Sequence, residues 1–180
     1  MSLKIVNVVA NFSLGKHLDL ATVAQKLWNV EYNPCKFGAV ILRQRNPTVT
    51  VLLFNRGKIV CTGAHSIVDC FLACKKLVRK LKRVLKVAVK MNEWKVRNVV
   101  ASFKLDHRVN LVQIKENVDN GLFSAYNITT CHYEPELFSA LQIKIPNRSI
   151  LIFTTGRIIL TGFIDPIELN AMYDNLKKAL

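Results

Sequence analysis

Several features that define common protein classes are missing from this chain of 180 residues. No apolar run approaches the roughly 18–20 residues of a membrane helix. The first residues, MSLKIVNVVANF, lack the apolar core and small-residue cleavage site of a signal peptide. We therefore expect a soluble intracellular protein. Catalytic signatures are missing too: there is no Ser-His-Asp pattern, no phosphate-cradling glycine loop and no plausible carboxylate pair. Asp106-His107 is expected to lie in a loop, and the chain is not expected to be an enzyme.

Cysteine is scarce and lacks a metal-binding pattern. Cys70 and Cys74 are spaced as neighbours on a helix, but there is no CxxC pair, and four scattered histidines do not complete a zinc quartet. The expected state is reduced thiols in a reducing compartment, with no metal and no cofactor. The five cysteines form an odd set: Cys35, Cys61, Cys70, Cys74 and Cys131.

Acidic residues are also few, with 12 Asp/Glu against 26 Lys/Arg and a net charge of +14. Residues 1–90 hold 16 basic and 3 acidic residues, whereas residues 91–180 hold 10 and 9. Such an excess of positive charge favours a polyanionic partner. The 51% hydrophobic content is sufficient for a core, and the 21% charged content argues against disorder.

Three sequence blocks occur twice in the same order, which indicates an internal duplication. They are NVVANF (7–12) with NVVASF (98–103), EYNPCKFGAV (31–40) with HYEPELFSAL (132–141), and VLLFNRGKIVCTG (51–63) with ILIFTTGRIILTG (150–162). We therefore expect residues 1–90 to form repeat 1 and residues 91–180 to form repeat 2 of one domain.

Hydrophobic periodicity predicts the same elements in both repeats, namely a strand, a helix, four strands and a long helix. Strands joined by short turns should pair antiparallel. The result is an α+β fold with helices on one sheet face and the other face open. In repeat 1 we expect strands at 4–13, 36–45 and 48–54, a hairpin at 51–63, and helices at 18–29 and 66–86; the last helix of repeat 2 should begin near Pro166.

The side chains that face away from the inferred helices match between the repeats. Each set is mostly apolar, with one amide, one hydroxyl and two phenylalanines. They are Asn7, Val9, Phe37, Leu52, Phe54, Val60 and Thr62 in repeat 1, and Asn98, Val100, Phe138, Leu151, Phe153, Ile159 and Thr161 in repeat 2. An apolar strand face more often belongs to a core. Here the opposite strand face and two helix stripes already supply one.

The repeated NVV, YNPxxF and YEPELF segments and the paired TG-ending hairpins resemble the conserved core of the TATA-box-binding protein family. The resemblance covers essentially the whole chain and implies a pseudo-twofold saddle. Its curved ten-stranded antiparallel sheet would have helices on the convex face and would grip the minor groove of DNA with the concave face. It also implies a nuclear transcription initiation factor of a divergent eukaryotic kind.

Minor-groove chemistry agrees with this implied role. The groove offers mainly the acceptors A N3 and T O2, to which Asn7, Asn98, Thr62 and Thr161 can donate. The resemblance makes the two phenylalanine pairs the wedges that kink the duplex at both ends of the site. Candidate phosphate contacts beside the strands are Lys36, Arg43, Arg45, Arg56, Lys58, Arg148 and Arg157, with Lys144 as a weak carry-over. Solubilising charge is the alternative for this set.

The resemblance also implies protein partners. It assigns Glu134, Glu136 and Leu137 to transcription factor IIB, and Glu31 and Asn33 to factor IIA. The basic helix face with Lys75, Lys76, Arg79 and Lys80 is a docking surface for regulatory or general transcription factors, a contact with flanking DNA, or a solvated face. TBP-associated factors are further implied partners. A homodimer in the absence of DNA is a further possibility.

The chain departs from the family between Leu111 and Tyr133, where about nine extra residues are expected to form an extended surface loop around 115–130. Cys35 replaces a usual basic residue, and Gly38 and Ser139 stand beside two of the wedges. Two alternatives remain open: an interaction module that kept the fold but lost DNA bending, and a DNA-repair accessory domain. The four retained phenylalanines disfavour the first, and two complete repeats without a catalytic domain disfavour the second.

Overall fold

The computed structural model describes residues 2–180, which form two compact units. One unit is Val6–Arg97. The other is Asn98–Leu180 with the N-terminal segment that ends at Ile5. Ten strands belong to one sheet in the order β2-β3-β4-β5-β1-β6-β10-β9-β8-β7, and four α-helices accompany them. The expected α+β class with a ten-stranded antiparallel sheet is confirmed. Within residues 2–180, no helix has the length and apolarity that a bilayer span requires.

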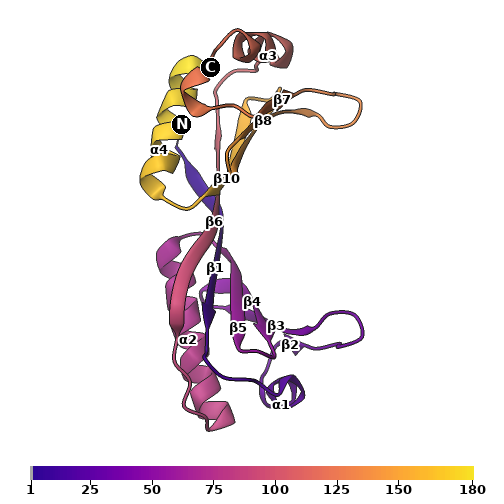
Figure 1. Cartoon of the computed structure of the whole chain (residues 1–180), viewed down its shortest axis with the longest axis vertical. Coiled ribbons are helices and arrows are strands. Elements are labelled where there is room, and N and C mark those ends of the chain that lie inside the picture. Colours follow the sequence, from indigo (N-terminus) through magenta and orange to yellow (C-terminus); the bar gives the residue numbers. More distant parts are fainter. Residues whose placement is uncertain (1) are drawn as a thin grey trace. The chain divides into compact units, whose positions relative to one another are not determined.

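The first unit holds most of β1, strands β2 to β5, the first residues of β6 and two helices. Helix α2 runs along one face of the strands, and α1 contacts both β3 and α2 (Figure 1). The loop that leads into β3 protrudes on the side opposite α2. The elements are β1 (Lys4–Ser13), α1 (Leu20–Lys26), β2 (Val30–Glu31), β3 (Ala39–Arg45), β4 (Thr48–Phe54), β5 (Lys58–Ala64) and α2 (Ile67–Leu85).

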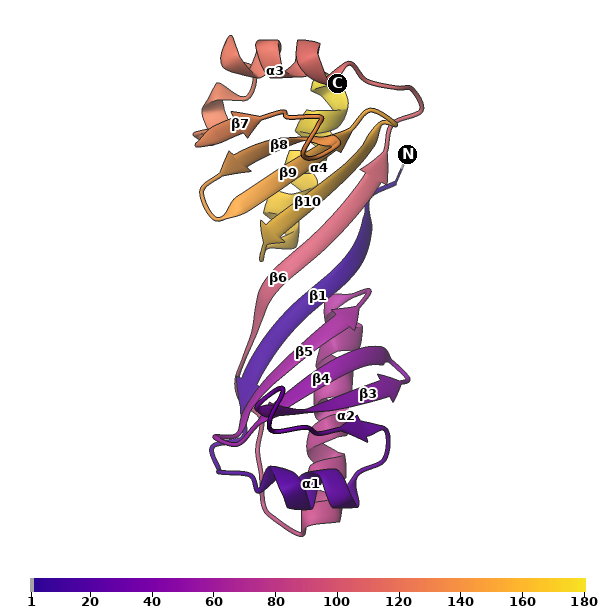
Figure 2. The same cartoon turned by 90° about the vertical axis from the view of Figure 1, so that its right-hand side faces the viewer.

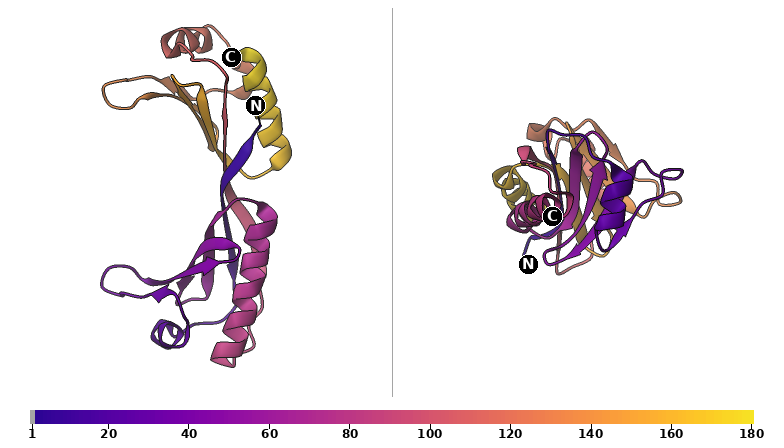
Figure 3. Two further views of the ribbon diagram at one scale, coloured as in Figure 1. Left: turned by 180° about the vertical axis from the view of Figure 1, so that it is seen from behind. Right: turned by 90° about the horizontal axis from the view of Figure 1, so that it is seen from below.

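The second unit repeats this element order, as the sequence predicts. Helix α4 lies along one face of its strands, and the loop before β8 protrudes on the other side (Figure 3, left). Strands β10, β9, β8 and β7 follow one another across the sheet (Figure 2). The elements are β6 (Asn92–Lys104), α3 (Leu111–Asp119), a 3-10 turn (Ser124–Tyr126), β7 (Thr130–His132), β8 (Ala140–Ile145), β9 (Arg148–Phe153), β10 (Arg157–Phe163) and α4 (Pro166–Ala179).

Alternation along the strands separates a core face from an open face. In β4, Val49, Val51 and Leu53 are buried, whereas Leu52 and Phe54 between and after them are half-buried. The same period of two runs through β5, β9 and β10. The buried set packs beneath α2 or α4, whose own buried residues recur at helical spacing. The half-buried set is left on the face without helices.

Each α-helix begins after a residue whose side chain caps its N-terminus, and these residues are of the types that sequence analysis associates with helix starts. Asp19, Ser66, Asn110 and Asp165 each accept a hydrogen bond from a backbone N–H in the first turn of the helix that follows. Pro166 occupies the first turn of α4, where its missing N–H costs nothing. The expected helix starts near residues 19, 66 and 166 are therefore confirmed.

Three expectations about element bounds are wrong. Helix α1 ends at Lys26 rather than at residue 29, because the backbone of Leu27 is extended. Strand β3 begins at Ala39 rather than at residue 36, because residues 34–36 form a turn. The extended loop expected around 115–130 is mostly ordered secondary structure: α3 continues to Asp119, a 3-10 turn follows, and β7 begins at Thr130. Helix α3 forms because Leu111, Ile114 and Val118 recur on one buried face, a signal that the polar residues between them obscure.

Candidate nucleic-acid interface

The predicted contact residues of repeat 1 lie together on the face of their unit that α2 does not cover. Strand pairing sets Leu52 opposite Val60 and Thr50 opposite Thr62. All of the predicted strand residues are half-buried, and Phe37 is 43% exposed. The face, here called open face 1, consists of Asn7, Val9, Phe37, Leu52, Phe54, Val60 and Thr62.

The second unit has a matching surface on the side that α4 leaves uncovered. Leu151 pairs with Ile159 as Leu52 pairs with Val60, and Phe138 is 48% exposed. This open face 2 consists of Asn98, Val100, Phe138, Leu151, Phe153, Ile159 and Thr161. The sequence therefore assigned both sets to one face of their own unit correctly.

Both phenylalanine pairs are formed, and their geometry is nearly the same. The ring centroids of Phe37 and Phe54 are 6.2 Å apart with an interplanar angle of 67°; for Phe138 and Phe153 the values are 6.2 Å and 68°. These are edge-to-face contacts, which aromatic quadrupoles favour. Each pair leaves one ring standing out from its sheet with close to half of its surface exposed.

A repeated turn holds each exposed ring in place. The backbone N–H of Phe37 donates to the carbonyl of Asn33 over 2.9 Å, and that of Phe138 donates to the carbonyl of Glu134 over 2.9 Å. The proline in each segment, Pro34 or Pro135, sits within the same turn. The hydrogen-bonded turns of the YNP and YEP segments thus orient the two phenylalanine rings.

The two asparagines are oriented by a glycine in the neighbouring strand. Oδ1 of Asn7 accepts from the N–H of Gly63 at 2.7 Å, and Oδ1 of Asn98 accepts from the N–H of Gly162 at 2.8 Å. Strand register shifts at this place in both units, which marks a bulge. Because the amide oxygen faces a backbone donor, each NH₂ group is turned the other way and keeps at least one N–H that can donate to another molecule.

Each threonine hydroxyl lies against the amide group of the asparagine in the neighbouring strand. The hydroxyl of Thr62 donates to Oδ1 of Asn7 at 3.2 Å, so its proton is already used within the protein. In the second unit, the hydroxyl of Thr161 lies 3.5 Å from Oδ1 of Asn98, to which it can donate, and 3.4 Å from Nδ2, from which it can accept. In open face 1 the amide of Asn7 is therefore the stronger candidate donor to a base edge, with Thr62 fixing its orientation.

Most of the predicted phosphate contacts are exposed on or beside the open faces. Arg43, Lys58 and Arg157 alternate with buried residues and so point away from the helices. Arg43 also reaches Oε2 of Glu31 at 3.3 Å, a contact between two well-exposed side chains that salt and a competing phosphate can displace. The remaining exposed members are Lys36, Arg45 and Arg56.

Arg148 is a correction to this set. It shares its strand side with the buried Ile150 and Ile152, binds the carboxylate of Glu168 in α4, and lies over the ring of Phe163 at 5.2 Å. Its side chain is therefore on the helix side and is already paired. Lys144, exposed and opposite Ser149, occupies the position that Arg43 holds opposite Thr50.

Sequence reasoning missed one difference between the open faces. Ile41 pairs with Leu52 in the first unit, and Gln142 pairs with Leu151 at the same place in the second. Both are half-buried. Alternation could have identified both residues, because Ile41 and Gln142 directly precede Leu42 and Ile143 on the buried side and so point to the open side. A polar amide thus replaces an apolar side chain in open face 2.

The residues assigned to protein partners are accessible. Glu134, Glu136 and Leu137 lie exposed in the turn before β8, and Leu137 is 82% exposed. Glu31 and Asn33 are exposed at the matching place in the first unit, although Glu31 contacts Arg43.

The basic face of α2 is accessible as well. Lys75, Lys76 and Arg79 are exposed, and Lys80 is half-buried. Two of these side chains have partners within the unit: Nζ of Lys76 donates to the carbonyl of Asn46 at 2.9 Å, and Lys75 lies over the ring of Phe71. Arg79 and Lys80 follow one turn later along the same helix.

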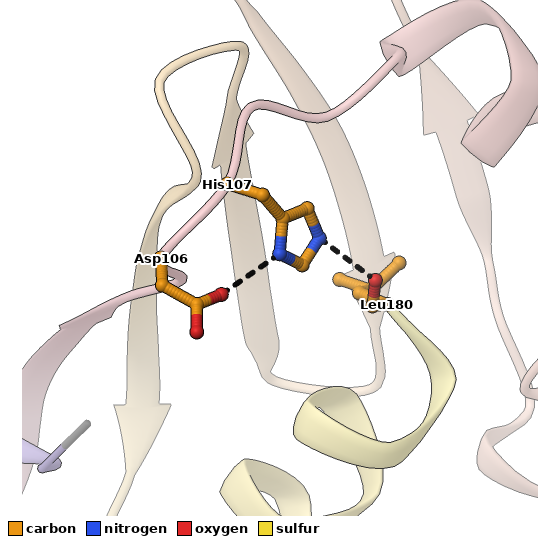
Figure 4. A network of polar contacts seen from close by, with 3 residues as sticks. All are labelled: Asp106, His107 and Leu180. Atoms are coloured by element: carbon orange, nitrogen blue, oxygen red, sulfur yellow. Dashed lines mark hydrogen bonds and ion pairs between the residues drawn. The ribbon is translucent and has the colours of Figure 1, made fainter.

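Asp106 and His107 lie in the loop after β6, as expected. Nδ1 of His107 contacts Oδ1 of Asp106 at 2.9 Å, and Nε2 contacts the carbonyl of Leu180 at 3.2 Å (Figure 4). The carboxylate of Asp106 and the Leu180 carbonyl raise the pKa of His107 above its usual value. The ring therefore fastens this loop to the end of α4, which is a structural contact.

Comparison with known proteins agrees with this geometry. The family model described as "Transcription factor TFIID (or TATA-binding protein, TBP)" matches residues 2–84 and 93–180. TATA-box-binding protein 2 of Entamoeba histolytica is 37% identical over 96% of this chain and 78% of its own length. TATA-box-binding protein of Saccharomyces cerevisiae is 40% identical over 87% of this chain and 62% of its own length.

A solved structure agrees as well. The TBP of Methanococcus jannaschii superposes with a TM-score of 0.78 at 33% identity, covering 99% of both chains. The family consists of DNA-binding transcription factors and not of enzymes, which confirms the expectation drawn from the missing catalytic patterns. The matched segments, the fold and the duplicated open faces together show that this chain belongs to the TATA-binding protein family.

Proposed function

We propose that this chain binds A·T-rich promoter DNA of the TATA type in the minor groove, kinks it with its two phenylalanine pairs and nucleates assembly of a transcription preinitiation complex in the nucleus. The observation that carries the proposal is the duplication of one constellation: an aimed aromatic pair, an oriented amide and an apolar strand surface on the helix-free face of each unit.

Base preference follows from the donors and the apolar surface. The amide NH₂ groups of Asn7 and Asn98 can donate to A N3 and T O2, which A·T and T·A pairs both present. Leu52, Val60, Leu151 and Ile159 offer nothing to a guanine amino group, which would lose its water without gaining a partner. The open faces therefore favour A·T pairs over G·C pairs.

Kinking requires rings that can enter between base pairs. Phe37 and Phe138 are partly exposed, and Phe54 and Phe153 support them edge-on. Unstacking a base step costs roughly a few kcal/mol, which is recovered when the bent, widened groove covers more protein surface. The backbone turns that hold the rings limit the conformational entropy that binding would otherwise cost.

Phosphate contacts would come from the exposed cations that flank each face. Lys36, Arg43, Arg45, Arg56 and Lys58 serve the first unit, and Lys144 and Arg157 serve the second. Binding should weaken steeply as salt rises, because each neutralised phosphate releases counterions.

The same proposal includes protein partners. Factor IIB would contact the exposed turn of Glu134, Glu136 and Leu137, and factor IIA the region of Glu31 and Asn33. TBP-associated or regulatory factors would dock on the basic face of α2, which is exposed and rich in cations. In the absence of DNA, the apolar open faces give a surface on which two copies could associate.

The deciding experiment measures bending of a TATA duplex carrying a fluorescent donor and acceptor at its two ends. We expect the wild-type chain to shorten the end-to-end distance, and Phe37→Ala and Phe138→Ala each to reduce the effect. Leu137→Ala is the matched control, because Leu137 is an exposed apolar residue in the same turn as Phe138 but belongs to the proposed protein contact.

Two results would contradict the proposal. One is a wild-type chain that leaves the duplex straight, which would favour an interaction module that has lost DNA bending. The other is unchanged bending by both phenylalanine variants at protein concentrations that saturate the duplex.

A further inference from the structure

Three cysteine thiols meet in the core of the first unit, outside every surface described above. Cys61 lies on the core side of β5, and Cys70 and Cys74 follow one another by one turn of α2. Their three Sγ atoms lie within 4.8 Å of one another, and each residue is fully buried. All three are free thiols. Sequence spacing paired Cys70 with Cys74 but could not show that Cys61 faces them from the sheet.

The second unit shows that this core does not require thiols. By position in the matching strand and helix, Leu160 of β10 corresponds to Cys61, and Leu169 and Tyr173 of α4 correspond to Cys70 and Cys74. Leu160 and Leu169 are buried in the same way. One fold therefore packs this place with ordinary core side chains in one unit and with three sulfur atoms in the other.

Three sulfur atoms in this arrangement fit a three-coordinate centre. Bonds to sulfur of about 2.3 Å keep three ligand atoms within about 4 Å of one another, so a small rotation of the thiols suffices. Structural zinc needs four ligands, and among the described residues the cluster contains only these three Cys, His, Asp or Glu side chains. Thiolate ligands select soft, thiophilic elements.

The net charge of the bound complex determines which thiophilic element can be accommodated in the buried core. A monovalent metal bound by three thiolates would leave a net negative charge in the core, where burying an unpaired charge is expensive. Trivalent arsenic or antimony avoids this cost, because its neutral hydroxide condenses with three thiols to a neutral product. Three S–H bonds and three metalloid–OH bonds break, three metalloid–sulfur bonds form, three waters leave, and no oxidant or reductant takes part.

We propose that Cys61, Cys70 and Cys74 form a buried three-thiol site for a trivalent thiophilic metalloid, with arsenous acid as its probe. Because the sulfur atoms have no exposed surface, entry requires transient opening of α2 over β5, and binding should be slow.

The test uses the full chain with Cys35→Ser and Cys131→Ser, which removes the two cysteines that are not buried. After incubation with arsenous acid, native mass spectrometry should show one arsenic atom per chain and a loss of three hydrogens, with no hydroxyl retained. The number of thiols that can be titrated after unfolding should be lower in the labelled sample than in an untreated one. Phe37 and the other open-face residues are left intact.

Variants in the same background locate the site. Cys61→Ala should abolish the three-bond adduct. Cys70→Leu introduces the side chain that the second unit carries at Leu169, so it keeps the core filled if the alanine variant fails to fold. It should also abolish the three-bond adduct. Circular dichroism shows whether each variant is folded. Three results would overturn the proposal. The parent chain could remain unlabelled, or its adduct could retain a hydroxyl. Folded Cys61→Ala or Cys70→Leu protein could also be labelled as fully as the parent.

Discussion

At the scale of single residues, function depends on which atom a neighbour leaves free. Asn7 and Asn98 have the same partner, the N–H of a bulged glycine, so their amide oxygens are fixed and their NH₂ groups remain as donors. Lys144 and Arg148 show the same point for charge, since only Lys144 is unpaired with an acid and faces away from the helices.

The amide of Asn7 should matter more for DNA binding than the hydroxyl of Thr62. Asn7→Ala removes a donor from the centre of open face 1, and we expect a loss of about 1–3 kcal/mol in binding free energy. Thr62→Val keeps the shape and removes a hydroxyl whose proton is donated to Asn7, so its effect should be smaller. Fluorescence anisotropy with a labelled TATA duplex measures both; a larger loss for Thr62→Val would contradict this order.

Salt dependence separates Lys144 from Arg148. If Lys144 neutralises one phosphate, Lys144→Gln should reduce the slope of log K against log salt by about 1. Arg148→Gln should leave the slope unchanged, because this guanidinium is bound to Glu168 on the helix side. Titrations of DNA binding at several salt concentrations give the slopes, and a reduced slope for Arg148→Gln would restore it as a phosphate contact.

Much of this residue-level arrangement could be predicted from the sequence. The strand period of two and the second copy of each block assigned both phenylalanine pairs and both asparagines to the face on which they lie. The role of Arg148 could not be predicted, because it depends on a hairpin that is one residue pair shorter in repeat 2, where Arg148 takes the place of the buried Val49, and on Glu168, 20 residues later in the chain. The meeting of Cys61 with Cys70 and Cys74 likewise depends on how α2 packs on β5.

At the scale of elements, the bulge in β5 and β10 positions the asparagine contacts. Gly162 has φ of +89°, and a Cβ atom there would lie 2.2 Å from the carbonyl oxygen of Asn147. Glycine is therefore required by backbone conformation and by close approach. Helix α3 shows the limit of element prediction, since its three buried residues are separated by mostly polar ones and it packs against β7 and β8, which are distant in sequence from its start.

Gly162→Ala should destabilise the fold and loosen open face 2. A positive φ and a backbone clash together should cost about 1–3 kcal/mol or more in the free energy of unfolding. Gly38→Ala is the matched control, because a Cβ at Gly38 meets nothing within 4 Å. Urea denaturation followed by circular dichroism compares the two variants, and equal stabilities would show that the bulge tolerates a side chain.

At the scale of the whole molecule, the order of elements was predictable because the sequence states it twice. The strand, helix, four strands and helix of each copy appear as expected, and family membership accounts for their arrangement in one sheet. The charge of the chain is not duplicated: nearly all of its positive excess lies in residues 1–90. The two copies therefore share a matching open face, whereas their surface charge and part of their cores differ.

The division into compact units carries one more consequence. The duplicated sequence suggests a boundary near residue 90, but packing places the segment ending at Ile5 with Asn98–Leu180, and residues up to Arg97 with the other unit. The boundary between the sequence repeats and the boundaries between the compact units thus fall at different places along the chain. A cut between residues 90 and 91 would return the two genetic copies, and each would lack a length of β-strand that its own unit contains.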